Sequence, residues 1–216
     1  MAGSSPAMVT KVTKPGQIVI LNGAPRSGKS SIASAMQESF AGVWINLGVD
    51  ASVAMTPARY RPGIGLRPGS ESPELEALIP TLYAALYDAV AAHSRLGLNV
   101  VVDVGHHDGY SKPLDILRDC ARRLEGLPVL FVGVRCPIEI IMQRRNQGEG
   151  RYVKGSPDDP VPQPVRRWQE AVHAHGLYDL EVDAGKLTPA ECADVIAQRL
   201  RAPITAPSAF QRLAGL

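Results

Sequence analysis

Short apolar runs alternate with longer amphipathic stretches along most of the chain. Five runs rich in β-branched and aromatic residues are typical of buried strands, and they lie at 17–22, 43–47, 98–102, 128–134 and 178–183. Between them, apolar residues recur every three or four positions, as they do in helices that bury one face. Strands that alternate with helices predict an α/β fold with a mostly parallel sheet and helices on both of its faces.

The amphipathic stretches predict six helices. The first covers 30–40, where Ile32, Met36 and Phe40 share one face. A long helix opens at Ser72 and Pro73 and continues to position 93, and Pro80 either kinks this helix or marks its true start. The remaining helices are expected at 112–125, 136–145, 165–175 and 188–200, the last of them opened by a Thr188–Glu191 capping box.

Four segments lack either periodicity. Residues 1–16 are expected to be a flexible lead-in, and 203–216 a loosely held tail. Residues 51–72 are rich in proline, glycine and arginine, and an irregular loop of this length is usually functional. Residues 146–164 combine glycines, prolines and basic residues, which is typical of a mobile lid that closes over a bound anion. The folded domain is therefore predicted to cover 17–202, with the lid inside it.

Composition excludes several classes of protein. The chain has 216 residues, which suits one α/β domain, and its formal net charge of +2 is too small to favour nucleic acid or a membrane surface as partner. No apolar run approaches the roughly 20 residues of a membrane span, and the first 16 residues contain no apolar signal-peptide core. The three cysteines are scattered, so neither a disulfide framework nor a zinc site is expected. These features predict a cytoplasmic protein.

One motif specifies chemistry. Gly23-Ala-Pro-Arg-Ser-Gly-Lys-Ser30 fits the G-x-x-x-x-G-K-[ST] phosphate loop, and it lies between a predicted strand and a predicted helix, as that motif requires. Its glycines let backbone N–H groups surround phosphate oxygens, Lys29 reaches the β- and γ-phosphates, and the Ser30 hydroxyl ligates Mg²⁺. The predicted nucleotide-binding residues are Gly23, Ala24, Pro25, Arg26, Ser27, Gly28, Lys29, Ser30 and Ser31.

Two aspartates follow predicted strands, at the sheet edge where open α/β sheets bind ligands. Asp50 comes after the second strand, where it could accept a proton from a hydroxyl group or simply cap a turn, and position alone does not decide between the two. Asp103 ends the third strand, which resembles the Walker-B carboxylate that holds Mg²⁺. We therefore expect Asp103 to bind the metal together with Ser30.

Basic residues and histidines complete the set of candidates. His106 and His107 follow Asp103, and they either line a substrate pocket or are ordinary polar loop residues. Arg144, Arg145 and Arg151 lie at a helix end and in the predicted lid, where they could stabilise phosphoryl charge or form a solvated basic face. The composition of the lid favours a functional role for at least one of these arginines.

Two classes of function remain open at this point. A GTPase is disfavoured, because the chain lacks an N-K-x-D element that would recognise guanine. A small-molecule kinase and a nucleotide-binding regulatory protein without phosphotransfer both fit a phosphate loop. Asp50, the loop at 51–72 and the basic lid favour the kinase.

Several further motifs give the chain a resemblance to a known family. They are Ile20-Leu-Asn-Gly23 with Gly28-Lys-Ser30, Gly48-Val-Asp50, the strand before Asp103, Val132-Gly-Val-Arg-Cys136, Tyr178-Asp, Glu181-Val-Asp183 and Glu191-Cys-Ala193. With these motifs the chain resembles chloramphenicol phosphotransferase, a small P-loop kinase that phosphorylates a primary hydroxyl of the antibiotic. The resemblance covers most of the chain between 17 and about 200.

The resemblance implies a P-loop nucleotide-kinase-like three-layer fold with a five-stranded parallel sheet and a mobile lid. It implies transfer of the γ-phosphate of ATP, with Mg²⁺, to a small hydroxylated acceptor. The roles it implies are a catalytic base at Asp50 and lid arginines at Arg145 and Arg151 that meet ATP. Beside these roles, we expect a nucleotide contact at Arg144 and an acceptor site that involves Asp50, Val53, Asp103, His106 and His107.

Two regions depart from the family pattern. The loop after Asp50 is shorter than in the family, and Gly105-His-His107 follows Asp103 where the family differs. Both regions should shape the acceptor pocket, so the activity class carries over better than the substrate. Chloramphenicol, with a role in antibiotic resistance, is the first expectation, and another hydroxylated metabolite, nucleoside or antibiotic is the alternative. A homo-oligomer is compatible with the sequence.

Overall fold

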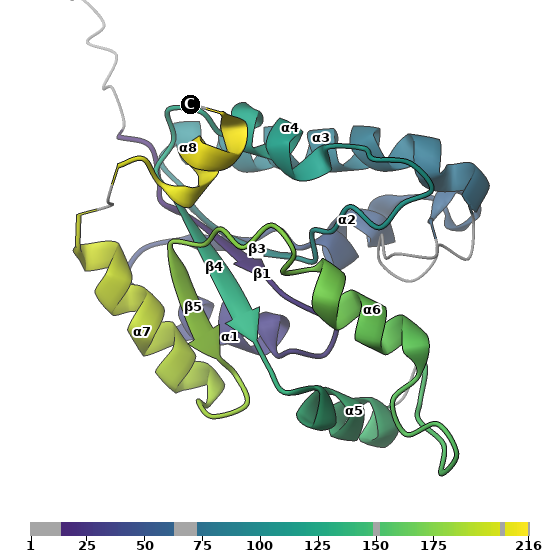
Figure 1. Ribbon diagram of the computed structural model, residues 1–216. Coiled ribbons are helices and arrows are strands. Elements are labelled where there is room, and N and C mark those ends of the chain that lie inside the picture. The colour runs from purple at the N-terminus through teal and green to yellow at the C-terminus, as the bar shows by residue number, and fades with distance from the viewer. Residues whose placement is uncertain (1–13, 63–72, 149–151, 204–205, 216) are drawn as a thin grey trace, which may run out of the picture.

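Five parallel strands form the centre of the computed structural model, which describes residues 14–62, 73–148, 152–203 and 206–215 (Figure 1). The strands lie in the order β2-β3-β1-β4-β5, and every neighbouring pair is parallel. Their bounds are β1 Ile18–Asn22, β2 Trp44–Asn46, β3 Asn99–Val104, β4 Val129–Arg135 and β5 Leu180–Asp183. The predicted α/β fold with a five-stranded parallel sheet is confirmed.

Helices cover both faces of this sheet and its carboxyl edge (Figure 1). Helices α1 and α7 pack together on one face, and α3, α4 and α8 pack on the other. Helices α5 and α6 lie beyond the carboxyl ends of the strands, and α2 follows β2. The bounds are α1 Lys29–Ser39, α2 Val49–Met55, α3 Ile79–Arg95, α4 Ile116–Arg123, α5 Ile138–Gln147, α6 Gln163–Ala171, α7 Pro189–Arg201 and α8 Ala209–Ala214, with short 3₁₀ helices η1 Ala58–Tyr60 and η2 Pro73–Leu78.

The central strand explains how the site is positioned. Residues 18–21 are apolar and fully buried, because helices cover both faces of β1. In the register of the sheet Leu21 lies opposite Asp103 of β3, and Asn22 lies opposite Gly133 of β4. The chain that leaves β1 at Gly23 therefore starts beside Asp103.

Several helix boundaries differ from the sequence expectations, and α2 and α3 show the physical reasons. Residues 49–55 form helix α2, although 51–72 was expected to be irregular. Val49 and Val53, four positions apart, pack against the core, which explains why this short segment coils. The long helix α3 begins at Ile79, with Pro80 in its first turn. The N–H groups of a first turn have no partner within the helix, so proline, which lacks this group, fits there. Pro80 thus marks the helix start and does not kink the helix.

The C-terminal segment also differs from expectation. Residues 203–216 were expected to be a loose tail, but 209–214 form α8, opened by a Ser208–Gln211 capping box. Phe210 is 4% exposed, and its ring lies 4.9 Å from Phe131. Six residues are too few to show a helical period in the sequence, so only the tertiary contacts reveal this helix.

One stretch among the described residues has the length and composition of a membrane span, which the sequence analysis did not expect. It is Glu74–Arg95, with a mean hydropathy of 1.3. Core helices pass the same test, and Tyr83, Tyr87 and Val90 of this helix belong to the buried core.

Candidate functional site

The phosphate loop joins β1 to α1 and folds around the Lys29 side chain. Lys29 is 8% exposed, and its Nζ donates hydrogen bonds to the backbone carbonyls of Gly23, at 2.9 Å, and Ala24, at 3.0 Å. Ser30 follows in the first turn of α1 and is exposed. The loop therefore presents an ammonium group and a hydroxyl group beside the open N-terminal end of a helix, an arrangement that suits phosphate.

Asp103 faces both of these groups from the end of β3. Its Oδ2 accepts a hydrogen bond of 2.7 Å from Ser30 Oγ, and its Oδ1 lies 3.5 Å from Lys29 Nζ. Hydroxyl and carboxylate oxygens are the hard ligands that Mg²⁺ prefers, usually with substrate phosphates and water as its other ligands. Within the described residues no cluster of three His, Cys, Asp or Glu side chains could hold a metal by itself. The pair Ser30 and Asp103 fits a magnesium ion that also binds phosphate.

Asp50 reaches the same place from the first turn of α2. Gly48 precedes this helix and lies so close to β3 that an added Cβ would be 3.3 Å from the Asp103 Cβ. This close approach brings the start of α2 against the end of β3. The exposed carboxylate of Asp50 has no hydrogen bond or ion pair to any described residue, which leaves it available to a ligand.

Asp50, Asp103, Lys29 and Ser30 line one common cavity of about 80 Å³, here named the carboxylate cavity. Its other walls include three aromatic residues that the sequence analysis did not place there: Tyr83 of α3, Tyr152, and Trp168 of α6. Tyr83 is 2% exposed and Trp168 is 3% exposed. These residues come from segments far apart in the chain, so no local pattern could have assigned them to one site.

A second cavity of about 350 Å³ adjoins the loop on its other side, here named the arginine cavity. It is lined by Arg144, by the start of α1 and by the segment after β5, including Ala184 and Leu187. Arg144 donates hydrogen bonds of 2.9 Å to the carbonyls of Ser27 and Ala184. The Arg144 guanidinium therefore links the phosphate loop to the segment after β5. The expected contact between Arg144 and a nucleotide stays a prediction.

The other two predicted arginines have different outcomes. Arg145 is 2% exposed, donates to the Val153 carbonyl at 3.4 Å and lies 5.3 Å from the centre of the Tyr152 ring. It is not among the described residues that line either cavity, so its expected contact with ATP stays a prediction. Arg151 lies outside the described residues.

The two histidines after Asp103 do not face the carboxylate cavity. His106 is 2% exposed, its Nε2 lies 2.7 Å from the Tyr87 hydroxyl, and burial lowers its pKa to about 3. His107 packs against Trp168, with ring centres 4.9 Å apart. Both histidines line a separate cavity of about 340 Å³ between α4, α6 and α8. The last residue of β3, Val104, and the first residue of the following loop, Gly105, line the carboxylate cavity instead.

Val53 is likewise absent from the described lining of the carboxylate cavity, because its side chain packs against the core. Three of the five acceptor residues expected from the sequence therefore lie outside the described lining of the carboxylate cavity. The acceptor contacts expected of Val53, His106 and His107 stay predictions.

Asn22 joins the strand before the phosphate loop to α6, a role that the sequence did not indicate. Its side chain is fully buried, its Oδ1 accepts from the His106 N–H at 2.7 Å, and its Nδ2 donates to the Val172 carbonyl at 2.9 Å and to the Tyr178 hydroxyl at 2.9 Å. These bonds fix the loop after β3 and the end of α6 relative to the phosphate loop.

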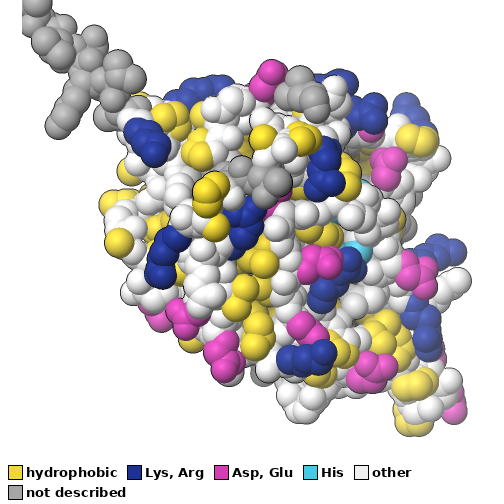
Figure 2. All heavy atoms as spheres, turned by 60° about the vertical axis from the view of Figure 1, so that its left-hand side comes forward, with side chains coloured by type: hydrophobic (Ala, Val, Ile, Leu, Met, Phe, Trp, Pro, Cys, Tyr) yellow, Lys and Arg dark blue, Asp and Glu magenta, His cyan; other side chains and the backbone are white. Residues whose placement is uncertain are grey.

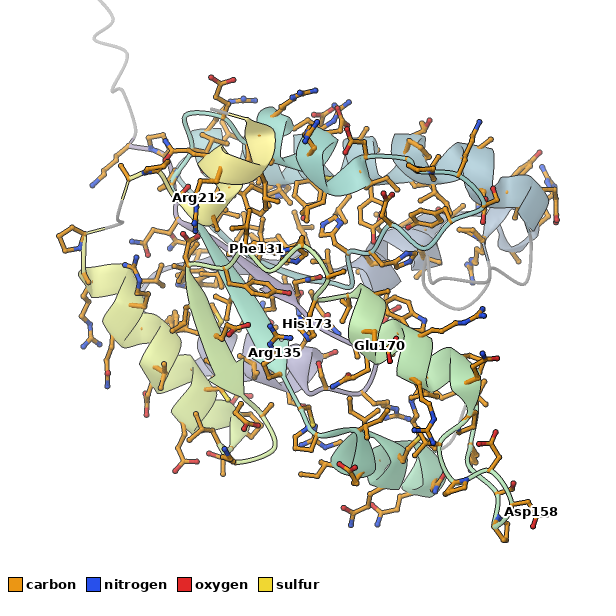
Figure 3. The ribbon with its side chains drawn as sticks, viewed as in Figure 1. Phe131, Arg135, Asp158, Glu170, His173 and Arg212 are labelled. Carbon is orange, nitrogen blue, oxygen red and sulfur yellow. The ribbon has the colours of Figure 1, made fainter. Side chains whose placement is uncertain are left out.

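Two more histidines belong to this buried polar network. His173 Nδ1 lies 2.6 Å from the Tyr178 hydroxyl, and Figure 3 shows His173 near Arg135 at the end of β4. Burial, with Arg135 nearby, lowers the pKa of His173 to about 3 and that of His175 to about 4. Both rings are therefore neutral at physiological pH, and they act as packing and hydrogen-bonding groups.

Charges of both signs are interspersed on the face shown in Figure 2. Lys and Arg side chains alternate there with Asp and Glu, in keeping with a net charge of +2. This face therefore carries no extended field of one sign that would attract a polyanion.

The sequence of the whole folded domain identifies the family. Residues 16–201 match the family model described as chloramphenicol phosphotransferase-like protein. The chain belongs to the chloramphenicol phosphotransferase-like family.

A curated relative of this family member is named "Putative O-phosphotransferase Rv2636", from Mycobacterium tuberculosis. The two are 30% identical over 212 residues, which cover 92% of this chain and 88% of the relative. The family and this relative support a phosphotransferase as the activity class.

Solved structures agree with the fold of this chloramphenicol phosphotransferase-like protein. A sugar kinase from Janibacter sp. HTCC2649 superposes with a TM-score of 0.58 at 19% identity, covering 93% of this chain and 99% of that one. An APS kinase from Mycobacterium tuberculosis, solved with AMPPNP and APS, gives 0.54 at 17% identity, covering 87% and 99%. At these identities the likeness establishes a P-loop kinase fold, and the family match adds the phosphotransferase class.

Proposed function

We propose that this protein is an ATP-dependent O-phosphotransferase that moves the γ-phosphate to a hydroxyl group of a small molecule. The observation that carries the proposal is the carboxylate cavity. In it, the phosphate-loop groups Lys29 and Ser30 and the metal-type ligand Asp103 face a carboxylate, Asp50, that has no partner of its own among the described residues.

The two cavities support separate binding sites for the nucleotide and the acceptor. Arg26, Lys29, Ser30 and Tyr152 line both cavities, so the cavities meet over the phosphate loop. ATP in the arginine cavity, with its base beside Arg144, would place its γ-phosphate at this meeting point. The acceptor would then approach from the side of Asp50.

Transfer proceeds by in-line displacement in this proposal. The acceptor oxygen forms a bond to the γ-phosphorus, the bond from that phosphorus to the β–γ bridging oxygen breaks, and ADP leaves with the electron pair. Asp50 accepts the hydroxyl proton, and Lys29 stabilises the charge that develops on the phosphoryl oxygens. Ser30 and Asp103 would hold a magnesium ion, which would neutralise part of the phosphate charge. Arg145 or Arg151 contributes further positive charge when the lid closes.

The walls of the carboxylate cavity favour an acceptor with a flat or apolar body. Tyr83 and Trp168 present buried ring surface next to Asp50, while the polar groups gather at the phosphate loop. Chloramphenicol is the first candidate acceptor, which would give the protein a role in antibiotic resistance. Another hydroxylated antibiotic, nucleoside or metabolite is the alternative.

The segment 146–164 serves as the lid in this proposal. Its described part joins α5 to α6 and carries Asp158 at a tip that projects away from the sheet (Figure 3). Residues next to the phosphate loop, Gly148 and Tyr152, lie at its base. Closure over bound ATP would exclude water from the site.

One experiment tests the proposal directly. Purified protein is incubated with ATP and Mg²⁺ and a panel of hydroxylated antibiotics, nucleosides and sugars, and each acceptor is examined by mass spectrometry for an added phosphate. Transfer to at least one acceptor, lost in Asp50→Asn, is the expected result. A protein that binds ATP but phosphorylates none of them would favour the second alternative, a nucleotide-binding regulatory protein.

A further inference from the structure

Tyr152 occupies a position that the roles described above do not explain. It belongs to the segment between α5 and α6, yet it lines both the carboxylate cavity and the arginine cavity. The other three residues that line both cavities, Arg26, Lys29 and Ser30, all belong to the phosphate loop or the first turn after it. Tyr152 is therefore the part of the described segment 146–164 that stands where nucleotide and acceptor would meet.

Two arginines from different elements hold the Tyr152 ring. The Arg26 guanidinium carbon lies 4.6 Å from the ring centre, and that of Arg145 lies 5.3 Å from it. Each such cation–π contact is worth about 0.5–2 kcal/mol, depending on how far water is excluded. Arg26 comes from the phosphate loop and Arg145 from α5, so the ring links the loop to the helix that leads into the predicted lid.

The backbone conformation of Arg26 is unusual at the point where its side chain extends to the Tyr152 ring. Arg26 is one of two described non-glycine residues with positive φ, at 72°, a conformation that costs free energy and persists only where surrounding contacts hold it. Arg144 supplies one such contact, a hydrogen bond of 3.2 Å to the Arg26 carbonyl. The Arg26 side chain then lies against Gly148, where an added Cβ would clash with its guanidinium. Gly148 thus leaves room for the contact between phosphate loop and lid.

We propose that Tyr152 is a positioning residue that shields the transferred phosphoryl group from water, held in place by Arg26 and Arg145. This inference rests on the proposed phosphotransferase function. The ring carries the proposed role, because both guanidinium groups lie over it, and no described residue forms a hydrogen bond with its hydroxyl. The shield makes the enzyme selective for an alcohol over water as the attacking group.

The competing reaction is hydrolysis. Water forms a bond to the γ-phosphorus, the bond to the β–γ bridging oxygen breaks, ADP and inorganic phosphate leave, and the proton of the water passes to Asp50 or to solvent. The Tyr152 ring, which lines the carboxylate cavity together with Lys29 and Ser30, slows this reaction until an acceptor hydroxyl occupies the cavity.

The test measures phosphate release from ATP and Mg²⁺ with no acceptor present. Tyr152→Ala is expected to release phosphate about tenfold faster than the wild type, which corresponds to an activation free energy lower by about 1.4 kcal/mol. Release is measured at saturating ATP, so that a change in ATP binding at the arginine cavity, which Tyr152 also lines, does not enter the comparison. Tyr152→Phe keeps the ring and should behave as the wild type. Arg26→Ala should resemble Tyr152→Ala, and Arg201→Ala, an exposed arginine of α7, is the matched control.

Equal phosphate release from wild type and Tyr152→Ala would overturn the inference, and so would a Tyr152→Phe variant as fast as Tyr152→Ala. Thermal unfolding midpoints of all variants show whether each is folded. The readout needs ATP alone, so it is independent of the acceptor screen. A wild type that phosphorylates some acceptor, combined with unchanged hydrolysis in Tyr152→Ala, would refute the role of Tyr152 and leave the proposed function standing.

Discussion

Asp50 lies in the first turn of α2, after β2, and Asp103 lies near the end of the neighbouring strand β3, yet their surroundings differ. Asp103 is half-buried and already engaged by Ser30 and Lys29, whereas Asp50 is exposed and has no partner among the described residues. A carboxylate bound to a hydroxyl and an ammonium is suited to metal binding, and a free one to accepting a proton. These contacts support the different roles proposed for the two residues.

Replacing Asp50 by Asn should abolish most transfer while ATP still binds. General base catalysis contributes roughly 10²–10⁴-fold, so turnover with a working acceptor should fall by about that factor. Calorimetric titration with ATP and Mg²⁺ should show an unchanged affinity, because Asp50 does not contact the phosphate loop. An Asn variant with near-normal transfer would exclude Asp50 as the base.

Stability should fall below pH 6.5 because of His106. Burial lowers its pKa from 6.5 to about 3, so between these values the unfolded chain binds a proton that the folded chain does not. The free energy of unfolding is therefore fully retained above pH 6.5 and decreases as the pH falls, by about 1.4 kcal/mol per pH unit for one such group. Urea unfolding at pH 5 and 6 measures how steeply the free energy of unfolding depends on pH. His106→Gln should make this dependence shallower by the equivalent of about one bound proton. An equal slope in both proteins would show that His106 is protonated in the folded state.

Helix α8 illustrates how an element far from the site supports it. The helix packs on α4, and Phe210 reaches Phe131 of β4 and Tyr87 of α3, with ring centres 4.9 and 6.5 Å away. Tyr87 in turn contacts His106, which belongs to the loop that follows β3. The C-terminal helix is thus continuous with the packing behind the carboxylate cavity.

Phe210→Ala should destabilise the whole domain. Removing a buried phenyl ring typically costs about 3–5 kcal/mol through lost burial and the cavity left behind. The midpoint of urea unfolding, followed by far-UV circular dichroism, measures the loss. Arg212→Ala on the same helix changes an exposed side chain (Figure 3) and should leave the midpoint nearly unchanged. Similar midpoints for Phe210→Ala and wild type would mean that α8 is not part of the cooperative unit.

At the scale of the whole molecule, ligand binding and stability are coupled through the carboxyl edge of the sheet. The phosphate loop, α2, the segment before α6 and the loop after β3 all meet there. A ligand that contacts all of these segments binds only the folded chain, so it must stabilise the fold.

ATP with Mg²⁺ should therefore raise the thermal midpoint. At one hundred times its dissociation constant a ligand adds about 2.7 kcal/mol, or about 5–10 °C for a chain of this size. Differential scanning fluorimetry measures the shift. Lys29→Ala should lose it, because Lys29 supplies the charge at the mouth of the loop, whereas Arg201→Ala should keep it. A Lys29→Ala protein with the full shift would place nucleotide binding elsewhere.

The amino-acid sequence by itself determined the phosphate loop, the alternation of strands and helices, and the positions of Asp50 and Asp103 on the carboxyl side of the sheet. These features depend on local spacing, and spacing is visible in a sequence: a buried parallel strand needs a continuous apolar run, and the phosphate loop needs its glycines at fixed positions. The family motifs extended this to the activity class, which the match over 16–201 supports.

The tertiary structure alone decided which side chains share the cavity. Tyr83, Tyr152 and Trp168 come from three distant segments, and only the packing of α3 and α6 against the sheet edge brings them to Asp50. His106 and His107 follow Asp103 in the sequence, where functional residues were expected. The loop after β3 buries them against Tyr87 and Trp168. Contacts between remote segments depend on the whole packed core, and no local pattern of residues encodes them.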